Sequence, residues 1–388
     1  MIKCVKCGEV DAIAKSGTIR GKQRYYCSKC DYYFTLSGEQ PVTIAHHKRH
    51  PATILDIARE LHISKSTVSR ALHGHSDINE QTRNAVLEIA RKLEYQPNLL
   101  AYGLAKNKSM TIGIIVPEFI NSFFPFVIIG AQEVANPAGY HVLICQSNES
   151  YETEIANTNV LLSSRVDGLL VSLTGETPNI EHFKKFERAG IPVVYFNRVC
   201  KDTNVSKVIV DDYDGAFKGV VHLIENGCER IAHIAGPLNL QMSQNRLQGY
   251  LDALAQYNIA VDESLIVNYD LNPLQATECA KHLFNLSNPP NGLFAVNDPA
   301  AIAAMQVAKE SGIKIPSQIA VVGFSNEPVS AFIEPGLTTL AQPMADIGRT
   351  AIQLLFDQIE VENEMQEPEI KILKTTLIVR GSSLRLKK

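Results

Sequence analysis

The chain has 388 residues, of which 45% are apolar, and a formal net charge of -4. This length exceeds what one hydrophobic core ordinarily supports, so two or three domains are expected. No apolar stretch reaches the roughly 18 residues of a membrane span, and the N-terminus lacks the apolar segment of a signal peptide. The composition therefore argues against a membrane protein or an exported protein and predicts a globular protein of the cytoplasm.

The charge is unevenly distributed along the chain. Residues 1–108 hold 17 Lys and Arg against 10 Asp and Glu, whereas the remainder holds 20 against 31. A basic N-terminal part suits a polyanionic partner, because neutralising phosphates releases counterions and drives nucleic-acid binding. A chance excess of surface lysine is the alternative that the charge alone leaves open.

The first 40 residues contain two pairs of cysteines, Cys4 with Cys7 and Cys27 with Cys30, each pair separated by two residues. This spacing predicts a tetrahedral zinc site that closes a small ribbon, because so short a segment needs metal binding to fold. Two disulfides are the alternative, which a reducing compartment disfavours. The remaining cysteines are scattered and are expected to be small core residues: Cys145, Cys200, Cys228 and Cys279.

Residues 21–30 resemble the zinc ribbons at the N-termini of certain insertion-sequence transposases and their regulators, over roughly residues 3–36. Phosphate contact by Arg20, Lys22, Arg24 and Lys29, and a purely structural or protein-binding role, are both open. Tyr25 and Tyr26 are either core or stacking residues. Residues 41–52 are predicted to be a linker, in which the histidines are solvated because four cysteines already complete the site.

Residues 53–96 predict three short helices that form a DNA-binding domain. Thr53 is a suitable N-cap for a first helix, Ser64 for a second over residues 65–73, and Asn79 for a third that ends near Leu93. A small bundle of this kind leaves its second helix free to enter a major groove.

The stretches 53–58, 63–72 and 95–98 resemble the lactose and galactose repressor family, and the likeness extends over roughly residues 53–383. The resemblance implies that the second helix reads DNA, since Arg and Lys donate to guanine whereas short hydroxyls reach phosphates. A merely solvated helix face is the alternative. The implied base-reading residues are Lys65, Ser66 and Arg70, the implied phosphate contacts are Ser64, Thr67 and Ser69, and Asn98 helps to anchor the backbone.

The resemblance also implies a hinge within residues 97–108. A short helix over residues 98–105 would place Leu104 as a wedge in the minor groove and Ala101 facing that groove. Such a helix is too short to persist alone, and Gly103 weakens it, so its folding is expected to require DNA. Tyr102 departs from the family pattern, in which an arginine is common.

Residues 109–388 contain seven short apolar runs that read as buried parallel strands separated by helices. They predict an α/β fold, and the resemblance implies two lobes of a periplasmic-binding-protein-like sensor that the chain crosses three times. The expected N-lobe comprises about 109–207 and 325–342, and the C-lobe about 208–324 and 343–388. Ligand is expected at the carboxyl ends of the strands. The seven runs are 112–117, 141–144, 168–171, 192–196, 231–235, 293–296 and 319–323.

The resemblance assigns six residues to the effector cleft. Phe124 is expected to stack on the effector, and Arg246 and Asp298 to bind its polar groups, which suits a sugar or a nucleobase. A core role for Phe124 and a structural ion pair of Arg246 with Asp298 are the alternatives. Three further residues, Asn197, Arg198 and Phe324, should line the cleft, although Asn197 stands where an acidic residue is frequent.

The sequence thus predicts a dimeric transcription repressor whose small-molecule effector either induces or co-represses. The resemblance implies a dimer that binds palindromic operators, because the family binds two half-sites related by two-fold symmetry, and no leucine-heptad tail of the kind that makes some relatives tetramers is seen. Two rivals are a solute-binding protein and a zinc-dependent accessory of a nucleic-acid enzyme. The DNA-binding stretch argues against the first, and the four cysteines leave no open metal position for the second, so no enzymatic activity is expected.

Overall fold

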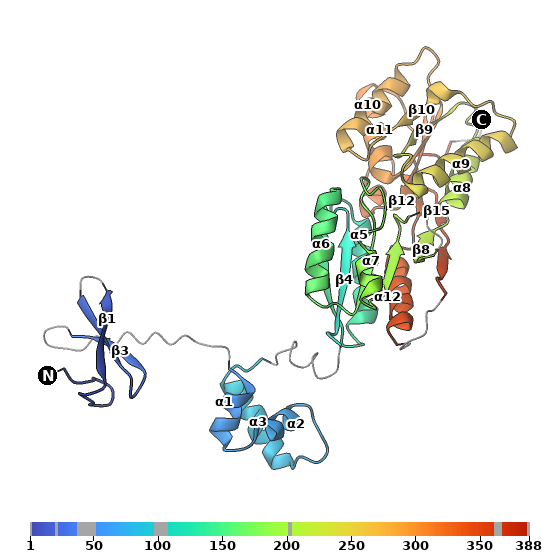
Figure 1. Ribbon diagram of the computed structural model, residues 1–388. Coiled ribbons are helices and arrows are strands. Elements are labelled where there is room, and N and C mark those ends of the chain that lie inside the picture. The colour runs from blue at the N-terminus through green and yellow to red at the C-terminus, as the bar shows by residue number, and fades with distance from the viewer. Residues whose placement is uncertain are drawn as a thin grey trace. The chain divides into compact units, whose positions relative to one another are not determined.

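The computed structural model describes residues 2–19, 22–36, 52–96, 108–200, 204–360 and 367–385. The chain divides into two compact units, residues 1–98 and 99–388, which are described in turn (Figure 1). Among the helices of the described ranges, none is both long and apolar enough to cross a bilayer.

The first unit begins with a small antiparallel sheet in the order β1-β2-β3. Its strands are β1 (Ile13–Ile19), β2 (Lys22–Cys27) and β3 (Tyr32–Thr35). The buried apolar cluster of the described part of this segment consists of Cys4, Cys27 and Phe34, with a few half-buried neighbours. So small a core supplies little free energy of folding on its own.

Three helices follow, namely α1 (Ile54–Leu61), α2 (Lys65–Leu72) and α3 (Glu80–Lys92). Their N-caps are Thr53, Ser64 and Asn79, which confirms the predicted helix starts. The side chains of Ser64 and Asn79 accept backbone N–H groups of the first turn that would otherwise lack partners, whereas Thr53 donates its backbone N–H and its hydroxyl to Asp56. The helices enclose a compact core formed by Ile57, Ala58, Val68, Ala71, Val86 and Ala90.

The second unit contains two six-stranded sheets. The first sheet is parallel throughout, in the order β14-β8-β7-β6-β4-β5. The second, in the order β10-β9-β11-β12-β13-β15, is parallel except at its β13-β15 edge. The strands are β4 (Thr111–Val116), β5 (His141–Gln146), β6 (Gly168–Val171), β7 (Val193–Phe196), β8 (Ser206–Val210), β9 (Ile231–Ala235), β10 (Ile266–Asn268), β11 (Gly292–Ala295), β12 (Ala320–Ser325), β13 (Thr338–Ala341), β14 (Ile370–Leu373) and β15 (Thr376–Ile378).

Helices cover both faces of each sheet. In the first lobe α5 and α12 pack on one face and α6 and α7 on the other, so alternate residues of β4 enter different cores. In the second lobe α8 and α9 cover one face and α10 and α11 the other. The bounds are α5 (Phe123–Ala135), α6 (Tyr151–Ser163), α7 (Lys184–Arg188), α8 (Asp212–Glu225), α9 (Gln241–Gln256), α10 (Pro273–Phe284), α11 (Asp298–Glu310) and α12 (Met344–Glu360), with 3-10 turns at Glu263–Leu265 and Pro328–Ala331.

The chain passes between the lobes three times, after β8, after β13 and after β14, as expected. The predicted lobe boundaries were wrong, however. Residues 325–342 belong to the second lobe, because β13 pairs with β12 and β15 there. Residues 344–373 belong to the first lobe, because α12 packs on α5 and β14 pairs with β8.

The α5 and α12 helices approach each other closely through two glycines. A β-carbon at Gly348 would lie 1.9 Å from the Val127 carbonyl oxygen, and one at Gly130 would lie 2.0 Å from the carbonyl oxygen of Ala345. Backbone therefore meets backbone at this crossing, and any side chain larger than hydrogen would force the two helices apart.

Candidate nucleic-acid interface and effector site

The four N-terminal cysteines form one cluster, in which all the sulfur atoms lie within 4.8 Å of one another. The Sγ atoms of Cys4 and Cys30 are 3.6 Å apart and those of Cys7 and Cys27 are 3.7 Å apart. A tetrahedral zinc with bonds of about 2.3 Å places its sulfurs about 3.8 Å apart, so the donor set fits that metal. All four thiols are free, and the separations are far longer than a disulfide of about 2.05 Å.

The two tyrosines of β2 have different surroundings. Tyr25 packs on the buried Phe34, with ring centroids 5.8 Å apart, and so contributes to the small core. Tyr26 stacks on Tyr33 at 4.6 Å instead, and its hydroxyl donates to Asp31 over 2.8 Å. The core alternative therefore fits Tyr25, whereas Tyr26 packs against Tyr33 outside the buried cluster.

The α2 helix has one buried and one polar face, because its apolar side chains recur with helical spacing. Val68 and Ala71 are buried, whereas Lys65, Ser66 and Arg70 are exposed. The helix therefore presents to solvent the three side chains that were predicted to read bases.

The start of α2 is fixed by hydroxyl contacts. The Ser64 hydroxyl accepts the Thr67 backbone N–H over 3.1 Å and lies 2.8 Å from the hydroxyls of both Ser66 and Thr67. At the other end Arg70 forms an ion pair with Asp77 in the loop before α3. Ser69 lies between them, half-buried. These contacts fix the positions of the Ser64, Ser66 and Thr67 hydroxyls and of the Arg70 guanidinium.

The remaining predicted DNA contacts, Asn98, Ala101 and Leu104, lie outside the described residues, as does all but the last residue of the predicted linker 41–52. The hinge helix therefore stays a prediction.

In the first lobe, polar residues gather where β5 and β7 end. The Arg198 guanidinium is buried and donates to Glu149 through two hydrogen bonds of 2.6 and 2.9 Å. Asn197 precedes it in the left-handed backbone region at φ 57°, which asparagine tolerates better than most residues. Phe124 is only 2% exposed and packs against Phe196 with the centroids 6.3 Å apart.

In the second lobe, Arg246 is the largest fully buried side chain. Its Nε and Nη2 atoms donate to Asp212 over 2.8 and 2.7 Å, and its guanidinium lies 3.6 Å from the Phe324 ring centroid. Asp212, rather than the expected Asp298, is thus its hydrogen-bonded partner. A buried histidine, His233, stays neutral near it because burial lowers the pKa of His233 to about 4.

Asp298 is completely buried at the start of α11. Burial raises the pKa of Asp298, and hydrogen bonds from Thr339, Ser330 and the Glu327 backbone N–H partly offset this rise. The charges of Asp298 and of Arg198 in the first lobe also act on the pKa of Arg246, which burial lowers and Asp212 raises. The hydrogen bonds of Asp298 all come from its own lobe, and its role in the effector site stays a prediction.

Hydrogen bonds between described residues join the lobes directly at two places. Glu327, after β12, accepts the Ser122 backbone N–H over 3.1 Å and also the Ser122 hydroxyl. Asn239 of the second lobe donates to the Gly175 carbonyl of the first. The backbone beside Glu327 is unusual, since Ser325 has φ 126° and Asn326 φ 58°, and such conformations concentrate at functional sites.

Comparison with known proteins gives a consistent answer for both units. Residues 53–98 match the model of bacterial regulatory proteins of the lacI family, and residues 220–383 match a periplasmic binding protein-like domain. The HTH-type transcriptional repressor CytR of Escherichia coli (strain K12) is 33% identical over 335 residues, which are 86% of this chain and 97% of that repressor. The chain belongs to the LacI family. It is a DNA-binding transcription repressor that responds to a small molecule.

Two solved structures resemble this LacI-family repressor along most of its length. The lac repressor dimer bound to operator and the anti-inducer ONPF is 25% identical with a TM-score of 0.77, and the match covers 87% of this chain and all of that one. A complex of the transcriptional regulator CelR with cellobiose is 29% identical with a TM-score of 0.66, and the match covers 85% and 99% of the two chains. These relatives are regulators, which decides against the solute-binding and enzyme-accessory alternatives.

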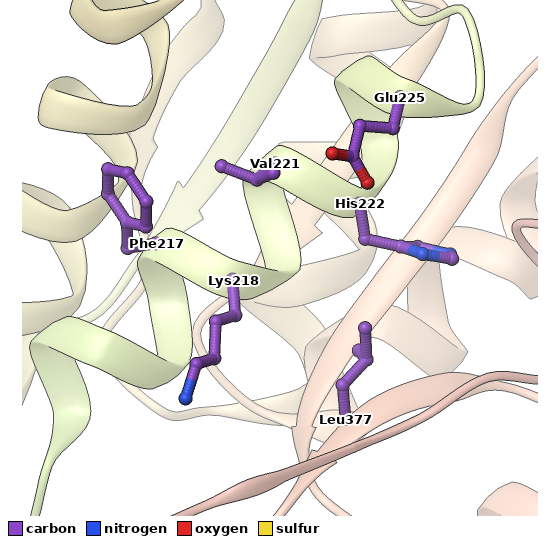
Figure 2. Close-up of a pocket in the computed structure, with 6 residues that line it drawn as sticks. All are labelled: Phe217, Lys218, Val221, His222, Glu225 and Leu377. Carbon is purple, nitrogen blue, oxygen red and sulfur yellow. The ribbon is translucent and has the colours of Figure 1, made fainter.

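A surface pocket of the LacI-family repressor lies away from the predicted cleft residues (Figure 2). It measures about 250 Å³ and is lined by one face of α8 and by β15. None of the six predicted effector residues lines it. Its lining residues are Phe217, Lys218, Val221, His222, Glu225 and Leu377.

Sequence reasoning missed three acidic residues of the cleft region, namely Glu149, Asp212 and Glu327. Glu149 and Glu327 follow strands that were predicted, so the rule that sites form at the carboxyl ends of strands could have found them. Asp212 follows β8, which was not predicted, and had no comparable signal.

Proposed function

We propose that this LacI-family repressor binds an inverted-repeat operator as a dimer, with α2 in the major groove. The exposed polar face of α2 supports the proposal most directly. Lys65 and Arg70 would donate to guanine edges, with Ser66 beside them, while Ser64, Thr67 and Ser69 would hold phosphates. By resemblance Asn98 would anchor the backbone, and Ala101 and Leu104 would meet the minor groove. The protein would act in the cytoplasm.

The test is selection of binding sites from random duplex DNA with the full-length protein. We expect an inverted repeat, and we expect Arg70→Ala to lose about 1–3 kcal/mol of discrimination per half-site because one bidentate base contact is removed. Arg91→Ala, an exposed arginine in the last turn of α3, is the matched control and should retain the preference. Recovery of no inverted repeat would overturn the proposal.

The dimer is supported by an apolar surface on the first lobe. Strand β5 lies at the edge of its sheet and exposes Leu143 and Ile144, each 41% accessible. The neighbouring helix α5 exposes Phe126 and Ile129. An apolar sheet edge beside an apolar helix face is costly in water and is typical of a subunit contact.

A sugar or a sugar derivative is the effector class that the cleft favours. Arg198, which is buried, and Glu149, whose side chain is 40% exposed, supply a charged donor and acceptor at the ends of β5 and β7, which suits ligands rich in hydroxyl groups. The nucleobase alternative needs an aromatic face open to the ligand, whereas Phe124 and Phe324 are 2% and 0% exposed. The effector would act by binding one arrangement of the lobes more tightly than another and so altering operator affinity.

For the N-terminal segment the proposal is a zinc ribbon of the kind found in insertion-sequence transposases and their regulators. The support is the cluster of four free thiols with near-tetrahedral sulfur separations in a segment that has almost no apolar core. Bound zinc would be held by Cys4, Cys7, Cys27 and Cys30 and would stabilise the fold, because four ligands leave no position for substrate.

A further inference from the structure

The ribbon carries a polar, aromatic surface that its core does not use. The rings of Tyr26 and Tyr33 pack against each other at an angle of 36°, and Tyr33 is 38% exposed. The Arg24 guanidinium lies 4.1 Å from the centroid of the Tyr33 ring. A cation held over an aromatic ring keeps its N–H donors available while its position is fixed, which suits phosphate oxygens.

Three basic residues of the β1–β2 hairpin have no acidic partner within the described part of the ribbon. Lys15, Lys22 and Arg24 form no ion pair there. The acids Glu9 and Asp31 are already engaged, Glu9 by Lys29 and Asp31 by the Tyr26 hydroxyl. Uncompensated cations on two paired strands create a positive potential that attracts a polyanion.

The register of the hairpin distributes these cations over both of its faces. Lys22 and Arg24 are two residues apart on β2 and share one face, whereas Lys15 pairs with Tyr25 and lies on the other face. We propose that this hairpin binds the phosphate backbone of duplex DNA beside the operator through cations on both faces, as a second DNA contact in addition to α2. The proposal rests on the zinc ribbon and on the operator binding proposed above.

Duplex DNA is favoured over a protein partner for two reasons. The hairpin has three cations without an acidic partner beside aromatic rings, whereas Asp11 is the one exposed acid of the described ribbon that no side chain engages, so the balance of charge favours a polyanion over a basic protein. In addition, the ribbon is joined to the three-helix DNA-binding domain of residues 53–96, here called the reader, by the 16 residues that separate Leu36 from Thr53. These residues span at most about 55 Å. Operator binding by α2 therefore keeps the ribbon within roughly 15 base pairs of each half-site and raises its effective concentration there.

The experiment compares the full-length protein with the variant Lys15→Gln/Lys22→Gln/Arg24→Gln on the selected operator. Two duplexes are used, one ending at the inverted repeat and one extended by about 15 base pairs on each side. The expected result is that the wild-type protein binds the long duplex more tightly and that the variant does not. The variant should also lower the slope of log affinity against log salt by about 2–3 per ribbon, since each phosphate contact contributes about 0.9.

A matched control removes three exposed lysines of the second lobe, in Lys281→Gln/Lys309→Gln/Lys314→Gln, and should behave as the wild type. Zinc content is measured for every protein and should be one ion per chain. If the triple variant loses zinc, Lys15→Gln/Lys22→Gln leaves the Arg24–Tyr33 contact intact and should lower the slope by about 1.8. The proposed second contact would be overturned if a zinc-loaded variant kept the salt slope and the preference for the long duplex. It would also be overturned if the purified wild-type protein contained no zinc. In both cases the selected operator would still be bound, whereas failure of the proposed function would yield no operator at all.

Discussion

Arg246 shows how the contacts of a residue can differ from those that a resemblance implies. It was expected to bind the effector together with Asp298. Its hydrogen bonds, however, go to Asp212 and to the Val296 carbonyl, and its face is covered by Phe324. An arginine with these contacts stabilises the second lobe, so loss of effector response after its removal would not by itself identify a ligand contact.

This pairing predicts a large effect of Asp212→Asn on stability. Removing the carboxylate leaves a buried charge without compensation, so the free energy of unfolding should fall by about 3–5 kcal/mol in denaturant titrations. The control is Asp214→Asn on the same helix, whose partner Lys218 is half exposed, and this change should cost less than about 1 kcal/mol. If Asp212→Asn also costs less than about 1 kcal/mol, the buried pair is not ionic.

At the level of elements, sequence reasoning succeeded where the signal is local. The helices of the reader were predicted from their caps, and the seven predicted strands are all present as β4, β5, β6, β7, β9, β11 and β12. The strands that were missed have weaker patterns: β8 buries Lys207, and β13 is rich in threonine. Lobe membership of β13 and α12 depends on pairing between distant segments, which hydrophobic periodicity does not encode.

The exposed surface of α5 and β5 carries the next prediction. Ile129→Glu/Ile144→Glu places two carboxylates on the proposed subunit contact, because Ile144 lies on the α5 face of β5 as Val142 does, and should convert a dimer into a monomer in sedimentation experiments, since burying unpaired charges is costly. Operator affinity should fall with it, since one reader then binds one half-site. Val261→Glu, at an equally exposed apolar residue of the second lobe, should leave the dimer intact. If the double variant remains dimeric, this surface is not the subunit contact.

At the scale of the whole molecule, Glu327 tests the link between lobe arrangement and effector. A screen of sugars should find one that raises the melting temperature and changes operator affinity of the wild type. Glu327→Gln weakens the charge-assisted contact with Ser122, so the affinity for that sugar should change about tenfold. Glu310→Gln, on the exposed end of α11, is the control. A response to nucleobases alone would favour the alternative effector class.

The glycine crossing of α5 and α12 has a consequence for how the two ends of α5 communicate. Ser122 at its start touches the opposite lobe, whereas Phe126 and Ile129, one and two turns later, belong to the proposed subunit contact. The backbones of α5 and α12 are in contact at Gly130 and Gly348, so no side chains lie between them there that could rearrange to absorb a displacement. We therefore expect α5 to move as a rigid body. Opening of the lobes at Ser122 would then reorient one subunit against its neighbour, which alters the spacing of the paired readers.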